Sequence, residues 1–171
     1  MIFIFLLSAK AGFTQETEFK FTKDGFTDFV VVQCENKTQA ELYKKTLDWI
    51  AVNYNTPSVV IKGQIENDYI RIEGSVNDLI TSSSKYQIEI SFKDEKYKFD
   101  VIEFLYWSEF PEPKYKEFDM SNTKKHYNKQ GQIKHSFKLE SERLPKYFNA
   151  LNSSLKEYLL SEQIPSKKKE W

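Results

Sequence analysis

The chain has 171 residues, of which 40% are hydrophobic, 16% aromatic and 29% charged, and its formal net charge is zero. This composition excludes a disordered polar chain and fits one folded domain with extensions. It also argues against a nucleic-acid-binding domain: residues 28–106 carry 9 Lys/Arg against 13 Asp/Glu (net −4), and residues 107–171 carry 13 against 9 (net +4), so the basic surplus lies outside the expected domain.

The chain begins with a short apolar run, Ile2 to Leu7, followed by small residues. Such a run is too short to span a bilayer and is typical of a secretory signal. We therefore expect residues 1–14 to be a signal peptide, cleaved after Ala11 or Thr14, and the protein to be periplasmic or secreted with no transmembrane span left. Because a positively charged start is missing, an alternative stays open in which the run is the first strand of a cytosolic domain.

Residues 15–25 are a polar lead-in, and a first strand is predicted from Phe26 to Cys34. Thr38 and Glu41 have the spacing of a capping box, which predicts a helix from there to about Tyr54. Apolar residues recur at three- to four-residue spacing and predict a face packed on a sheet: Leu42, Tyr43, Leu47, Ile50 and Tyr54. Cys34 is the single cysteine, so no internal disulfide forms, and we interpret it as a buried hydrophobe.

Four alternating runs follow the helix and predict two hairpins. Pro57 ends the helix, and the strands are expected at 58–64, 69–76, 86–92 and from 97 to about 106. Strands with one apolar and one polar side indicate an antiparallel sheet that is covered on one face. The predicted fold class is α+β, with the order β-α-β-β-β-β over residues 26–106.

The pattern changes after this domain. Residues 107–142 are predicted to be an extended polar and aromatic segment, 143–162 a C-terminal α-helix, and 163–171 a charged tail. The helix is indicated by an apolar stripe with Pro145 in its first turn: Leu144, Phe148, Leu151, Leu155, Tyr158 and Leu159.

Part of this pattern resembles a known family. The helix segment Glu41 to Ile50 with Tyr43 and Trp49, the run Ser58 to Ile61, and the hairpin from Tyr86 to Val101 are similar to those of an uncharacterised family of small exported bacterial proteins. That family is described as having a TATA-box-binding-protein-like (TBP-like) fold. The resemblance covers residues 28–106 and implies a strongly curved antiparallel sheet with helices on one side. It brings no activity, ligand or catalytic residue.

Two groups of residues are candidates for binding. The first is an aromatic set of a kind enriched in protein interfaces, with completion of the core as the alternative: Tyr106, Trp107, Phe110 and Tyr115. The second is a basic segment interleaved with an aromatic, as in phosphate- or single-strand-binding segments, with a solvated linker docked on the acidic domain as the alternative: Lys124, Lys125, His126, Lys129 and Lys134.

A third group consists of the carboxylates Glu89, Asp100 and Glu103, which would converge in the right strand register. An ordinary solvated sheet face with partners such as Lys98 explains them more simply. No catalytic residue, metal site or cofactor is predicted, since no motif for one is present.

The leading hypothesis is therefore an exported, non-enzymatic binding or structural module whose aromatic segment engages another protein or an envelope component. Nucleic acid is not an expected partner in that reading. The alternative is an intracellular binder of nucleic acid or a phosphate ligand that uses the basic segment, and a hydrolase comes third.

Overall fold

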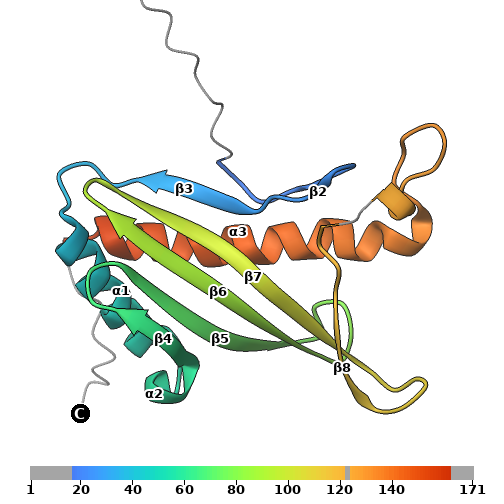
Figure 1. Ribbon diagram of the computed structural model, residues 1–171, viewed down its shortest axis with the longest axis horizontal. Coiled ribbons are helices and arrows are strands. Elements are labelled where there is room, and N and C mark those ends of the chain that lie inside the picture. Colours follow the sequence, from blue (N-terminus) through green and yellow to red (C-terminus); the bar gives the residue numbers. More distant parts are fainter. Residues whose placement is uncertain (1–16, 122–123, 163–171) are drawn as a thin grey trace, which may run out of the picture.

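A computed structural model describes residues 17–121 and 124–162. It shows a curved antiparallel sheet with a long helix running behind it (Figure 1). In chain order the strands are β1 (Phe21–Thr22), β2 (Gly25–Phe26), β3 (Phe29–Gln33), β4 (Ile61–Ile65), β5 (Tyr69–Asn77), β6 (Ser83–Lys93), β7 (Lys96–Ser108) and β8 (Lys114–Glu117). The helices are α1 (Gln39–Asn53), α2 (Pro57–Val60) and α3 (Lys138–Leu160), with short 3₁₀ turns η1 (Lys124–His126) and η2 (His135–Phe137).

The main sheet has the strand order β3-β7-β6-β5-β4. β7 pairs with three strands. β6 pairs with one edge of β7 along most of its length, and two strands share the other edge. β3 pairs with the first part of that edge, residues 96–100, and β8 pairs with the last part, residues 105–108. β3, α1, β4, β5, β6 and β7 thus confirm the predicted β-α-β-β-β-β order.

One face of the sheet holds the core. Alternate residues of β5, β6 and β7 are buried against α1 and α3, which also contact each other. Phe148 of α3 lies at the centre, with its ring centroid 5.7 Å from Tyr86, 6.0 Å from Phe26 and 6.2 Å from Phe104. None of the helices of the described residues covers the opposite face, here called the open face (Figure 1).

The predicted capping box of α1 is confirmed. The Thr38 hydroxyl accepts from the Glu41 amide at 3.3 Å, and the Glu41 carboxylate accepts from the Thr38 amide at 2.8 Å. The β6–β7 turn is tied to the same end of the helix, because the Asp94 carboxylate accepts from the Gln39 amide at 2.9 Å. Local hydrogen bonds therefore fix where α1 meets the hairpin.

Three boundaries differ from the expected ones. The first strand begins at Phe29, because Phe26 pairs with Phe21 in the small β1–β2 hairpin. Residues 57–60, expected as strand, form the helical turn α2, in which Pro57 supplies a helical φ at the first position and the Val60 amide donates to Thr56 O at 3.2 Å. α3 begins at Lys138, so Pro145 lies inside it rather than in its first turn.

The helix continues through Pro145 because apolar side chains on both sides of the proline are buried against the sheet. Pro145 has no N–H to donate to the carbonyl of Ser141, so one main-chain bond is missing. Leu144 and Phe148, on either side of the proline, are both fully buried and hold the two halves of α3 on the sheet.

The predicted extended segment 107–142 contains more structure than expected. It completes β7, forms β8 and then folds into a loop between η1 and η2, where Tyr127 and Ile133 pair as an isolated bridge. The expected signal peptide, residues 1–14, and the expected tail, residues 163–171, lie outside the described residues.

Candidate binding surfaces

The ends of β7 and β8 form a hairpin that projects beyond the sheet, here called the arm (residues 107–116; Figure 1). Phe110 lies at its tip with 82% of its surface exposed. Its carbonyl oxygen accepts from the Ser108 hydroxyl at 2.9 Å and from the Lys116 ammonium, and Lys114 forms an ion pair with Glu112. The turn is thus closed by its own polar groups, and Phe110 stays largely exposed to solvent.

The base of the arm is fastened to the sheet. The Trp107 and Tyr115 rings meet edge to face with centroids 5.2 Å apart, and the Tyr115 hydroxyl is hydrogen-bonded to the Ser83 hydroxyl at 2.9 Å. The Lys85 ammonium lies 4.6 Å from the centre of the Tyr115 ring, within range of a cation–π contact. These contacts make the arm an ordered extension of the open face.

The fourth residue of the predicted aromatic set has a different place. Tyr106 pairs in register with Ser84, which is fully buried, and its ring lies 6.4 Å from Phe118. It packs at the margin of the core, on the other side of β7 from Trp107. The structure therefore brings Trp107, Phe110 and Tyr115 together in the arm and leaves Tyr106 outside it.

The open face carries ion pairs and an amide–carboxylate hydrogen bond. Arg71 donates to Glu89 at 2.7 Å, Lys98 to Asp100 at 3.1 Å, and the Gln87 amide to Glu103 at 3.1 Å. Glu89 and Asp100 are direct cross-strand neighbours, as the carboxylate hypothesis required.

The surroundings of these carboxylates are those of a structural network. Burial raises the pKa of Asp100, and the hydrogen bond and charge of Lys98 oppose that rise. The hydrogen bond to Glu89 raises the pKa of the Arg71 guanidinium. Glu89 and Glu103 are held by side chains of a neighbouring strand, and Asp100 is held by Lys98 of its own strand, so the geometry favours a structural role in the sheet.

The predicted basic segment is divided by the fold. The His126 ring stacks on Phe137 with centroids 3.8 Å apart, and burial followed by the charge of Lys125 lowers the pKa of its imidazole. Lys134 donates to the carbonyl of Lys125 at 2.7 Å, and Lys125 lies 4.0 Å from Asp119. These three side chains are engaged within the loop.

Lys124 and Lys129, by contrast, line a shallow hollow of about 180 Å³. Lys23, from the turn between β1 and β2, lies on its other side. No sequence pattern predicts Lys23 at this place, because nothing local links that turn to a loop about a hundred residues later.

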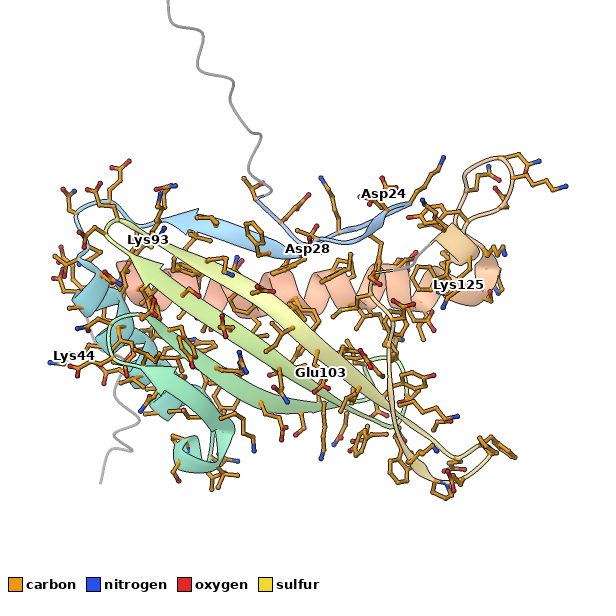
Figure 2. All side chains as sticks on the ribbon, in the orientation of Figure 1. Asp24, Asp28, Lys44, Lys93, Glu103 and Lys125 are labelled. Carbon is orange, nitrogen blue, oxygen red and sulfur yellow. The ribbon has the colours of Figure 1, made fainter. Side chains whose placement is uncertain are left out.

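A second hollow, of about 200 Å³, lies on the β7 edge between β3 and β8. Its lining is acidic and includes Asp28, Glu103, Glu117 and Asp119, of which Figure 2 labels the first two. Among the described residues, no three His, Cys, Asp or Glu side chains are grouped so that they would hold a metal ion.

Two further features belong to residues 17–121 and 124–162. Cys34 is buried, and burial raises the pKa of its thiol, as expected for a hydrophobic role. No helix in these ranges has the length and apolar character needed to cross a membrane.

The comparisons with known proteins agree with this geometry. A crystal structure of a TBP-like protein from Parabacteroides distasonis aligns with a TM-score of 0.58 at 16% identity, covering 79% of this chain and 92% of that one. A DUF4468 family protein from Bacteroides ovatus aligns with a TM-score of 0.61 at 10% identity, covering 88% and 94%. At these identities the likeness shows the fold alone.

No curated protein matches the chain. The family profile described as "Domain of unknown function (DUF4468) with TBP-like fold" matches residues 29–107. This range runs from the first residue of β3 to the last but one of β7. Residues 29–107 therefore match the DUF4468 domain of unknown function, and the sheet order and the two structural neighbours show that the fold is TBP-like.

Proposed function

We propose that the protein is an exported, non-enzymatic binding module that engages another protein through its arm. The observation that carries the proposal is the Phe110 ring, 82% exposed at the tip of a projecting hairpin. Burying a Phe side chain is favourable by roughly 1.5–3 kcal/mol relative to leaving it in water. A partner that covers this ring gains that free energy without having to order the arm first.

The rest of the arm supports a protein as the partner. Trp107 and Tyr115 continue the aromatic surface from the tip to the sheet, and both are only partly buried. Charged residues of both signs surround them, among them Glu112, Lys114 and Lys116. An aromatic centre with a polar rim is the usual anatomy of a protein–protein interface.

The binding proposal is tested by a photo-cross-linking residue placed at position 110 in the native host. Position 29 is the control, because Phe29 is also an exposed aromatic (44%) but lies on β3, away from the arm. We expect a discrete adduct from position 110 that disappears with Trp107→Ala. The partner identified in that adduct must then bind the purified protein saturably, about tenfold more weakly for Phe110→Ala. Equal adducts from both positions, or none from position 110, would contradict the proposal.

Export is the second part of the proposal, and the apolar run Ile2 to Leu7 supports it. The intact mass of the protein in fractionated native cells, expressed from its own locus, tests it. We expect a periplasmic or secreted species that begins at Gly12 or Gln15. A cytosolic species that retains Ile2 to Leu7 would rule out export and turn attention to the intracellular alternative.

A further inference from the structure

The hollow between the β1–β2 turn and the η1–η2 loop, here called the basic hollow, is built from two distant parts of the chain. Its lining is Lys23, Lys124, Tyr127, Asn128, Lys129 and Gly131. Both segments lie at the same end of the molecule, near the start of α3 (Figure 1). The arm is not part of this lining, so binding at the basic hollow is independent of the proposed function.

Gly131 allows the two segments to approach. A Cβ atom at this position would lie 2.6 Å from Nζ and 3.0 Å from Cε of Lys23, and the residue has a φ of +78°. The positive φ favours glycine, and the absence of a Cβ leaves room for the flexible end of the Lys23 side chain. The Lys23 side chain consequently lies across the loop backbone, which brings its ammonium group to the basic hollow.

The loop that carries the other two lysines is ordered by its own hydrogen bonds. The Asn128 side-chain oxygen accepts from the amides of Gln130 and Gln132 at 3.0 and 2.9 Å. The Asn128 amide donates to Gln132 O at 2.8 Å, and the Gly131 amide donates to Asn128 O at 3.0 Å. Lys124 and Lys129 are thus presented from a closed loop that is already arranged before any ligand binds.

Among the described residues, the three lysines of the basic hollow form no ion pair with a carboxylate. Within residues 17–121 and 124–162, Lys62, Lys98, Lys114 and Lys125 each lie within 4.0 Å of an acidic side chain, whereas Lys23, Lys124 and Lys129 form no such pair. Like charges gathered around one hollow repel each other, and a small anion between them reverses that interaction. Tyr127 and Asn128 add neutral polar residues to the lining.

We propose that the basic hollow binds a phosphate group, either free or as a phosphomonoester. A compact dianion suits several lysine ammonium groups, which act as mobile point charges around it. Among the described residues, Tyr127 is the one aromatic residue in the lining, so this part of the chain does not supply the succession of stacking platforms on which single-stranded nucleic acids bind. These features favour a phosphate group over a nucleic-acid strand.

The test is a titration of the full-length mature protein with inorganic phosphate at low salt, followed by the amide NMR signals of Tyr127, Asn128 and Gly131. Glycerol 3-phosphate and phosphatidylcholine vesicles with added phosphatidic acid then distinguish a soluble phosphomonoester from a lipid headgroup. We expect saturable shifts at the three amides. The affinity should fall as salt is raised, because charge attraction supplies it.

The decisive variant is Lys23→Ala/Lys129→Ala, with Lys44→Ala/Lys93→Ala as a control that removes the same charge. Lys44 and Lys93 are exposed and lie toward the opposite end of the molecule from Lys125 (Figure 2). Phosphate affinity should fall at least about tenfold in the first variant and change less than about twofold in the second, with thermal unfolding unchanged in both. Shifts that do not saturate, or an equal loss in both variants, would overturn the proposal.

Discussion

Gly74 is the residue on which the tyrosine cluster beneath the sheet depends. It faces Tyr86 across β5 and β6, and a Cβ atom at position 74 would lie 2.2 Å from the Tyr86 ring. The ring cannot move away easily, because its hydroxyl is hydrogen-bonded to Tyr54 at 3.2 Å and to Tyr147 at 3.1 Å. Burial raises the pKa of all three phenols, that of Tyr54 to about 12, so the cluster stays neutral at physiological pH.

Gly74→Ala should therefore lower the free energy of unfolding by about 1–3 kcal/mol, the usual cost of overpacking a core. Gly63→Ala is the matched control, since a Cβ there meets nothing closer than the Tyr69 hydroxyl at 3.8 Å. It should change stability by less than about 0.5 kcal/mol, as most surface substitutions do. Urea unfolding of both variants measures the difference, and equal effects would show that the Tyr86 ring can yield.

His126 makes the stability of the η1–η2 loop depend on pH. Burial of its ring on Phe137 lowers its pKa below the ordinary value, and Lys125 adds to this. The unfolded chain then binds the proton more readily, so the stabilisation is complete above about pH 6.5 and is lost as the pH falls through the folded-state pKa. His126→Phe keeps an aromatic ring on Phe137 but cannot titrate.

We expect the free energy of unfolding of the wild type, relative to His126→Phe, to decrease between about pH 7 and pH 5. Chemical unfolding at several pH values measures this difference. A difference that stays constant over the range would mean that the folded protein does not resist protonation of His126.

At the scale of elements, α3 holds the molecule together through Phe148. This fully buried side chain contacts the rings of Phe19, Tyr86, Phe104 and Tyr147. Phe148→Ala should cost about 3–5 kcal/mol, a large part of the total stability of an ordinary domain. Leu160 lies at the end of the same helix and is 45% exposed, so Leu160→Ala should cost less than about 1 kcal/mol. Thermal unfolding measures the loss of stability in each variant. Similar melting temperatures would mean that Phe148 contributes no more to stability than an exposed residue of the same helix.

The sequence predicted well the strands that bury one face, because apolar and polar residues alternate along them. β6 alternates along most of its length, β5 does so until its last residues, and β7 does so up to Val101, where its register with β6 shifts. Together with the capping box that marks α1, these patterns made the order of the elements predictable. Residues 57–60 were misread because Val59 and Val60 favour strands while Pro57 favours a helical first turn, and the helical turn prevailed. The start of α3 was misplaced because a buried face on both sides of Pro145 outweighs one missing hydrogen bond.

For the candidate surfaces, the sequence predicted groupings of residues that are close along the chain, but not contacts between distant segments. Trp107, Phe110 and Tyr115 are close in sequence, so the arm could be proposed from the chain alone. Tyr106 stands one residue from Trp107, and strand alternation already places the two on opposite faces. Lys23 meets Gly131 through tertiary packing alone, which no local pattern reports.

At the scale of the whole molecule, the hydrophobic core extends beyond the DUF4468 match. Residues 29–107 exclude Phe19, which is 1% exposed and whose backbone exchanges hydrogen bonds of 2.7 and 2.9 Å with the Asn149 side chain. They also exclude all of α3, with its buried apolar side chains Leu144, Phe148, Leu155, Tyr158 and Leu159. At roughly 1.5–3 kcal/mol for each buried large side chain, this loss matches or exceeds the 5–15 kcal/mol that typically stabilises a domain.

A fragment of residues 29–107 should therefore show no cooperative unfolding, whereas residues 17–162 should unfold in one transition. Circular dichroism against temperature and the dispersion of amide NMR signals measure both. The longer fragment is the control, because it keeps every described element and omits only the terminal segments. A cooperative transition in the short fragment would show that α1 alone suffices to cover the sheet. Its absence would mean that α3 and the β1–β2 segment belong to the same folding unit as the matched domain, and that the arm and the basic hollow are held on one cooperative scaffold.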